Sequence, residues 1–182
     1  MAKTDARVRY TLMVIKETFL NLLEQKPINR ITVKELCEKA NINRATFYAH
    51  FSDCFDLLEK IEGDILSEFE RSLNFVEKYD VAALVSAICN IIDKNKRVLK
   101  LIAFDGANSL LIPKMIDAAR ERSVSHWRKL LKNASEEELE MLYIHLSNGL
   151  TRVVAEEYEK FGRESLIDFI DKVVKNTLSI YA

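Results

Sequence analysis

The sequence predicts an all-α fold, and three observations support that prediction. Among its 182 residues are only four Gly and two Pro, so few positions break helices or favour turns. The composition is 48% hydrophobic and 30% charged, which suits amphipathic helices around a sizeable core. Apolar residues recur three and four positions apart along most of the chain, the period of a helix with one buried face. We expect about nine helices, forming a three-helix head that contains a helix-turn-helix and a larger helical body.

The first helix is expected from about Asp5 to Gln25. Pro27 then ends it, because proline lacks the N–H that would continue the helical hydrogen bonds. A single apolar stripe along this segment would pack against the next two helices. Its members are Val8, Leu12, Ile15, Phe19, Leu22 and Leu23.

Residues 31–51 predict two short helices joined by a tight turn. Thr32 and Glu35 have the spacing of a capping box, in which each side chain accepts a hydrogen bond from the other residue's backbone. Asn41 can adopt the left-handed backbone that ends a helix, and Asn43 is a favoured N-cap residue. The first of the two helices carries its apolar residues on one face: Val33, Leu36, Cys37 and Ala40.

The second of these helices, expected to continue to Phe51, would bury Phe47 and Phe51 and leave polar side chains on its other faces. Such a helix fits a DNA major groove, where the residues of its first turns reach base edges and others contact phosphates. An ordinary helical hairpin with a polar outer face remains an alternative at this point. The candidate DNA contacts are Thr32, Asn43, Arg44, Ala45, Thr46, Tyr48 and His50.

Roughly the first 60 residues resemble the DNA-binding domain of the TetR/AcrR family of bacterial transcriptional regulators. The chain departs from the family pattern at three positions. Asn41 replaces a turn Gly, Ala45 replaces a frequent Gly at the DNA surface, and Cys54 stands where the family often has a phosphate-contacting Lys. Beyond this segment the resemblance is limited to length and helical layout. The matching positions are Thr32, Val33, Ala40, Arg44, Tyr48, His50 and Phe51.

Helical periodicity continues through the rest of the chain. A fourth helix is expected to begin after Ser52 or Asp53 and to run towards Tyr79, with Gly63 in its interior as a hypothetical flex point. Ser135 and Glu138 have the spacing of a second capping box, and Gly162 is expected to end the helix that they begin. The expected helices of this region are Val81 to Asp93, Lys96 to Phe104, about Pro113 to Leu131, Ser135 to Phe161 and Glu164 to Tyr181.

Charge and layout together predict two domains. Residues 1–51 hold nine Lys and Arg against five Asp and Glu, whereas the remainder has a net charge of −5. A basic head on an acidic body suits a protein that meets DNA through one end. We expect a helix-turn-helix DNA-binding domain over residues 1–60 and an effector-binding and dimerisation domain over residues 61–182.

The last two helices have wide apolar stripes that can pack inward and also against a second copy of the chain. The resemblance to TetR regulators implies a homodimer formed through these helices, and a monomer is the alternative. Two recognition helices related by twofold symmetry would then require near-palindromic double-stranded DNA.

The body also contains bulky and hydrogen-bonding side chains suited to lining a site between helices. The resemblance implies that a small-molecule effector of unknown identity binds there and changes DNA affinity. The candidate pocket residues are Phe69, Phe104, Trp127, Tyr143, His145 and Asn148.

Nothing in the sequence calls for catalysis, a cofactor or a metal. No nucleotide-binding, nucleophile-elbow or zinc-protease motif occurs, and the three Cys are widely spaced, with no close pair. This spacing favours reduced thiols in a cytoplasmic protein, and a thiol redox sensor at Cys54 is an alternative. The longest apolar stretch is too short to span a membrane.

These observations predict a cytoplasmic, sequence-specific DNA-binding regulator that is not an enzyme and acts as a repressor released by a small molecule. Two alternatives stay open. One is a protein of the same fold that acts as a co-regulator through a protein partner without operator binding. The other is a helical small-molecule-binding protein without a nucleic-acid role.

Overall fold

The computed structural model describes residues 2–104 and 109–181, leaving aside the side chains of residues 2–5, 103, 104, 155 and 156. In this part of the chain the regular structure is entirely helical, as the sequence predicts. It has nine α-helices, a 3-10 turn at Ile28–Arg30 and a π-helical turn at Lys100–Phe104. The α-helices are α1 (Ala2–Leu23), α2 (Val33–Ala40), α3 (Arg44–Tyr48), α4 (Cys54–Ser72), α5 (Asn74–Glu77), α6 (Val81–Leu99), α7 (Leu111–Leu130), α8 (Glu136–Phe161) and α9 (Arg163–Ser179).

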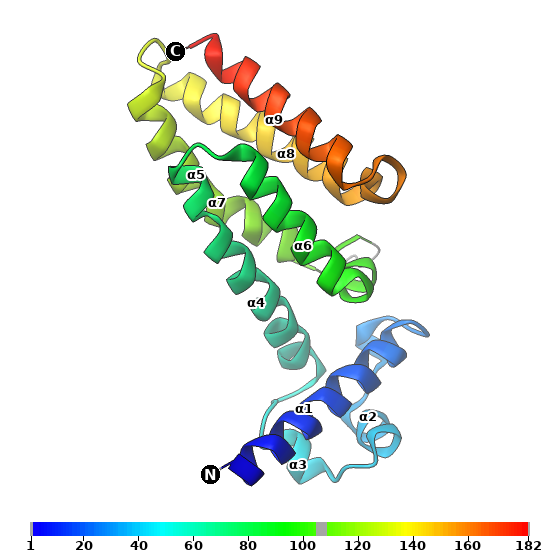
Figure 1. The fold of residues 1–182 in the computed structure, drawn as a ribbon. Helices are drawn as coiled ribbons and strands as arrows, with labels where there is room; N and C mark the ends of the chain where they lie inside the picture. The colour runs from blue at the N-terminus through cyan, green and yellow to red at the C-terminus, as the bar shows by residue number, and fades with distance from the viewer. Residues whose placement is uncertain (1, 105–108, 182) are drawn as a thin grey trace.

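Helices α1 to α3 form a head at one end of an elongated molecule, and α4 leads from this head into the body (Figure 1). In the body, α4 packs against α6 and α7, α6 packs against α9, and α7 packs against α8. Helices α8 and α9 also pack against each other, at the end of the molecule farthest from the head (Figure 1).

The head is built around aromatic and aliphatic side chains that face one another from its three helices. Ile15 and Phe19 of α1, Leu36 of α2 and Phe47 of α3 are all fully buried in one cluster. Burying a side chain of this size stabilises the fold by about 1.5–3 kcal/mol. The predicted three-helix core is therefore confirmed, and it fixes α3 against α1 and α2.

This cluster continues along α4 into the base of the body. Leu57 and Ile61 belong to it, as do Leu99 of α6 and Leu111 of α7. The predicted boundary between residues 60 and 61 consequently falls inside α4, whose buried side chains serve both the head and the body.

Several helices predicted from periodicity have different limits, and two regions differ most. The helix expected to run to Tyr79 is interrupted at Leu73, and the short α5 follows. Near this interruption, the buried Ser72 hydroxyl donates to the Phe69 carbonyl at 2.6 Å, a local bond that competes with regular helix geometry. Tyr79 then takes a positive φ of 55°, and the Asp80 side chain caps the next helix.

The segment expected to form two helices, over residues 81–93 and 96–104, is a single kinked helix followed by the π-helical turn. The kink lies at Asn95, with φ −114° and ψ 18°. The Asn95 side chain donates to the Ile91 carbonyl at 2.9 Å. The non-helical backbone at Asn95 falls between the two predicted helices, so the predicted interruption is present as a kink.

Candidate nucleic-acid interface and body cavity

Local hydrogen bonds fix the turn between α2 and α3. Asn41 adopts the left-handed conformation (φ 53°, ψ 46°) and ends α2. Asn43 caps α3: its Oδ1 accepts from the Thr46 backbone N–H at 2.7 Å and from the Thr46 hydroxyl at 2.9 Å. The roles predicted for the two asparagines are confirmed, and together they set the direction in which α3 leaves the turn.

The capping box predicted at the start of α2 forms only in part. The Thr32 hydroxyl accepts from the Glu35 backbone N–H at 3.2 Å. The Glu35 carboxylate instead forms a salt bridge with Lys26, in the segment that links α1 to the 3-10 turn. Glu35 therefore ties α2 to the preceding segment, because an ammonium group is a stronger partner for a carboxylate than a backbone amide.

Helix α3 presents its candidate contacts on the side away from the core. Phe47 has 0% of its surface exposed and Phe51 8%, whereas Tyr48 is 56% exposed. The half-buried candidates are Thr46 and His50, and the other candidates are exposed. Helix α3 ends at Tyr48, so His50 lies in the turn after it instead of within a longer helix as predicted. The exposed candidates besides Tyr48 are Thr32, Asn43, Arg44 and Ala45.

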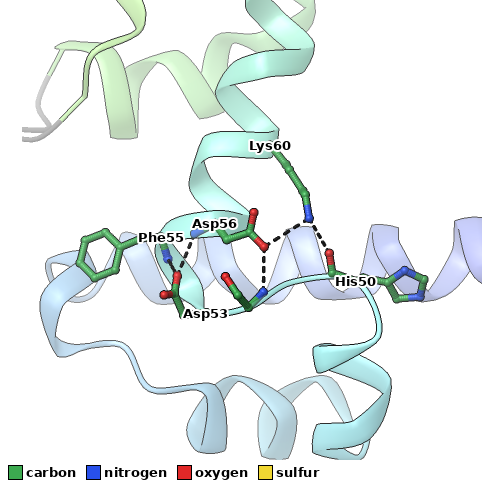
Figure 2. A network of polar contacts seen from close by, with 6 residues as sticks. His50, Asp53, Phe55, Asp56 and Lys60 are labelled. Carbon is green, nitrogen blue, oxygen red and sulfur yellow. Dashed lines mark hydrogen bonds and ion pairs between the residues drawn. The ribbon is translucent and has the colours of Figure 1, made fainter.

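A polar network fastens the end of α3 to α4 (Figure 2). The Lys60 ammonium donates to the His50 carbonyl at 2.6 Å and to the Asp56 carboxylate at 3.2 Å. The same carboxylate accepts from the Ser52 backbone N–H at 2.7 Å. The His50 imidazole itself points away from this network (Figure 2). The network uses the backbone of His50, so its side chain stays available for an outside partner.

Charge and capping reinforce this junction. The Asp53 carboxylate caps α4 by accepting from the N–H groups of Phe55 and Asp56, both at 2.8 Å. The Ser52 N–H and, secondarily, Lys60 lower the pKa of Asp56. Sequence reasoning missed this network, although Asp56 and Lys60 have the i, i+4 spacing of a helical ion pair.

Cys54 is only 4% exposed, at the first position of α4. Burial, with a smaller contribution from the nearby Asp53 carboxylate, raises the pKa of the Cys54 thiol to about 11. A protonated, buried thiol is a poor nucleophile, which disfavours the redox-sensor alternative. Cys54 is here an apolar packing position.

The body contains a cavity of about 210 Å³, partly open to solvent, between α4, α5, α6, α7, α8 and α9. Three of the predicted pocket residues line it: Phe69 from α4, Trp127 from α7 and Tyr143 from α8. The Tyr143 hydroxyl donates to the Ile116 carbonyl. Burial raises the pKa of Tyr143 to about 12, so its hydroxyl stays protonated near neutral pH.

The prediction is corrected for His145 and Asn148, and Phe104 lies outside the described side chains. His145 and Asn148 are exposed on α8 and do not line the cavity. The inner face of α8 follows the three-and-four spacing of Tyr143, Leu146 and Leu150, and this spacing turns the other two side chains outward. The helical periodicity of α8 in the sequence could therefore have shown that Tyr143 faces inward while His145 and Asn148 face outward.

Within residues 2–104 and 109–181, no group of three or more His, Cys, Asp or Glu side chains is arranged to hold a metal ion. His126 stacks on Tyr79 with 6.3 Å between ring centroids, and its buried Nε2 has no hydrogen-bond partner. None of the helices in the described ranges combines the length and the apolar character needed to cross a membrane.

Comparison with known proteins identifies the head. Residues 17–61 match the family described as bacterial regulatory proteins, tetR family. A stretch of 59 residues is 34% identical to the uncharacterized HTH-type transcriptional regulator YxbF of Bacillus subtilis (strain 168). That stretch covers 32% of this chain but only 16% of YxbF.

A solved structure extends the likeness to the whole fold. The dihydroxyacetone kinase operon activator DhaS superposes with a TM-score of 0.67, covering 94% of this chain and 97% of DhaS, at 17% sequence identity. The arrangement of the body helices is therefore shared, although few of their residues are.

Proposed function

We propose that this chain, whose residues 17–61 match the tetR family of bacterial regulatory proteins, is a sequence-specific DNA-binding transcriptional regulator that acts in the cytoplasm. One observation carries this proposal: α3 is anchored by the fully buried Phe47 and presents Arg44, Ala45 and Tyr48 outward. A rigid helix with a polar, exposed face is what reading a major groove requires.

Each exposed residue has a role suited to its chemistry. Arg44 can donate two hydrogen bonds to the O6 and N7 of a guanine, and the small Ala45 lets the helix approach the base pairs closely. The Thr46 hydroxyl donates to Asn43, so it contacts DNA as an acceptor or through its methyl group. Tyr48 and the His50 imidazole contact phosphates, as does Thr32 at the start of α2, and these contacts position the head without reading sequence.

We also propose a homodimer, built on α8 and α9. The predicted stripe of α8 packs inward in part, since Leu139, Leu142 and Leu146 are buried within one chain. A second set of large apolar side chains on the two helices stays exposed in the single chain, where contact with another copy would cover it. These are Met141 and Ile144 of α8, Phe169 of α9, and Ile180 directly after α9. Two heads would then meet a near-palindromic site.

Release by a small molecule needs a physical connection from the cavity to the head, and α6 supplies one. Its Ile88 and Ile92 line the cavity. Beyond the kink at Asn95, Arg97 donates to the carboxylate of Glu17 on α1 at 2.9 Å. It also donates to the carboxylate of Glu24, directly after α1, at 2.8 Å. A ligand that moves α6 would therefore move α1, which supports a repressor whose operator affinity falls when the cavity is filled.

A gel-shift experiment on the DNA upstream of the protein's own coding sequence tests DNA binding. We expect a specific complex that Arg44→Ala weakens by about 1–3 kcal/mol, whereas Tyr48→Phe weakens binding to all sequences alike. Affinity should also fall with salt, with a log–log slope near −0.9 for each phosphate contact.

Arg71→Ala is the matched control, because Arg71 is exposed on α4 at the end away from the head. An unchanged complex in Arg44→Ala, or binding that does not depend on salt, would contradict the proposal.

The co-regulator alternative has one observation in its favour, the buried neutral Cys54 at a position where related sequences often carry a lysine. It predicts that no DNA sequence selected from a random pool forms a specific complex, although the chain folds and dimerises. The same gel-shift experiment, extended to that pool, separates the two functions.

A further inference from the structure

The cavity in the body is lined almost entirely by hydrocarbon. Its wall combines isoleucine, leucine and valine side chains from α4, α6, α7, α8 and α9 with the aromatic rings of Phe69 and Trp127. Among the lining residues that the structure describes, Asp80 is the one that carries a charge. Its carboxylate is exposed and accepts the Ala83 N–H at 2.9 Å as the N-cap of α6. The Asp80 carboxylate is therefore solvated and caps a helix, while it keeps its negative charge.

The hydrogen-bonding groups of the wall are few and uncharged. They include the hydroxyls of Tyr143, Ser147 and Thr151 on α8 and of Ser123 on α7. The Tyr143 proton is donated to the Ile116 carbonyl, and the Ser147 hydroxyl hydrogen-bonds to the Tyr143 oxygen. Such a wall can satisfy one or two polar atoms of a ligand. It holds no described cationic side chain to neutralise an anion.

Charge and size together restrict what can bind. An ion moved from water into an apolar space without a partner loses its hydration and gains nothing in return. A dry apolar cavity of about 150 Å³ is enough to hold benzene, so this cavity of about 210 Å³ accepts a somewhat larger molecule.

We infer that the effector of this protein is an uncharged, predominantly apolar small molecule of about ten non-hydrogen atoms, with at most one or two hydrogen-bonding groups. Carboxylates and phosphate esters of the same size are rejected because the lining holds no described cation, and an ammonium group would have to leave water for the Asp80 carboxylate, which is itself exposed to solvent. The inference rests on the proposed function, because it names the chemical class of ligand for the regulator's own cavity.

Three probes that share an octyl chain and differ in charge test this inference: n-octanol, octanoate and octylammonium. Trp127 is the only tryptophan of the chain and lies in the cavity wall, so its fluorescence reports binding to the wild-type protein. We expect n-octanol to shift the Trp127 emission and to raise the melting temperature. Octanoate and octylammonium should bind at least about tenfold more weakly.

A cavity-filling variant locates the site. Ala119 lines the cavity from α7, so Ala119→Phe should abolish the response to n-octanol. Glu121→Phe is the control, because it adds the same ring at an exposed position two residues further along α7. The comparison of the three probes on the wild-type chain needs no variant and stands if Ala119→Phe fails to fold.

The inference is overturned if either charged probe binds as tightly as n-octanol, or if none of the three binds. A gel shift without any probe keeps this result separate from the proposed function. DNA binding without n-octanol binding would remove the inferred ligand class and leave the regulator. Selective n-octanol binding without DNA binding would support the ligand class and remove the regulator.

Discussion

In the head, short hydrogen bonds between neighbouring residues hold polar side chains outward, whereas in the body apolar side chains from distant parts of the chain line a cavity. Asn43 and Thr46, three residues apart, fix the start of α3. The cavity instead needs residues as far apart as Phe69 and Ile170. The two regions meet along α4 and at the contact of Arg97 with Glu17 and Glu24.

The DNA-reading surface and the apolar cavity therefore restrict the amino-acid sequence in different ways. A surface that reads DNA must present fixed groups, so its residue types are restricted one by one. A cavity for an apolar ligand needs only volume and the absence of charge, which many combinations of residues provide. The head consequently matches a known family over residues 17–61, whereas the body shares its fold with DhaS at 17% identity over most of the chain.

The largest expected effect lies in the core of the head. Phe47→Ala removes a fully buried ring and should lower the free energy of unfolding by about 3–5 kcal/mol. Tyr48→Ala, at the next and mostly exposed position, should change it by less than about 0.5 kcal/mol. Urea unfolding followed by circular dichroism measures both. If both variants lost the same free energy of unfolding, α3 would not have one buried face and one exposed face.

The caps of α3 and α8 offer a matched pair from the two regions. Asn43→Ala and Ser135→Ala each remove a side chain that accepts from a first-turn N–H, and each should cost about 0.5–2 kcal/mol of stability. Only Asn43→Ala should also weaken DNA binding, since α3 carries the proposed contacts. If Ser135→Ala weakened DNA binding as much as Asn43→Ala does, the proposal that the head alone contacts DNA would be wrong.

Arg97→Ala tests the connection between the regions. Its ion pairs are largely exposed, so the loss of stability should be below about 1 kcal/mol. In Arg97→Ala, n-octanol should lower DNA affinity by a smaller factor than in the wild type, because the contacts that connect α6 to Glu17 and Glu24 would be lost. Arg128→Ala is the control, since it removes a double contact with Glu136 within the body alone. A loss of coupling in the control, or none in Arg97→Ala, would argue against transmission through α6.

The smallest effect concerns the junction of α3 and α4. Because the folded state lowers the pKa of Asp56, its ionised carboxylate stabilises the fold at neutral pH. That contribution is lost as the pH falls below the ordinary value of 3.8 and through the lower folded-state pKa. The wild type should therefore exceed Asp56→Asn in stability at neutral pH, and the difference should shrink on acidification. A difference that does not vary with pH would show that the carboxylate acts through its shape and not its charge.

The sequence predicted those parts of the structure that depend on neighbouring residues. The caps at Asn43 and Ser135 and the left-handed Asn41 follow from local hydrogen bonding, and short-range chemistry is the same in a peptide as in a fold. The buried face of α3 followed from the spacing of Phe47 and Phe51.

What the sequence did not predict depends on residues brought together by folding. The bond from Lys60 to the His50 carbonyl and the contact of Arg97 with Glu17, on another helix, have no local signature that fixes both partners. The apolar periodicity continues past Leu73, so it gave no sign that the helix is interrupted there. His145 and Asn148 were placed in the pocket by residue type alone, and the orientation of α8 turns them outward.

Footprinting of the purified protein on DNA that it selects from a random pool tests the central claim most directly. We predict two protected half-sites of opposite orientation, with centres about one helical turn or a small multiple of it apart, and their loss in Arg44→Ala. Protection of a single site without symmetry, or of no sequence at all, would contradict a pair of α3 helices that read adjacent major grooves.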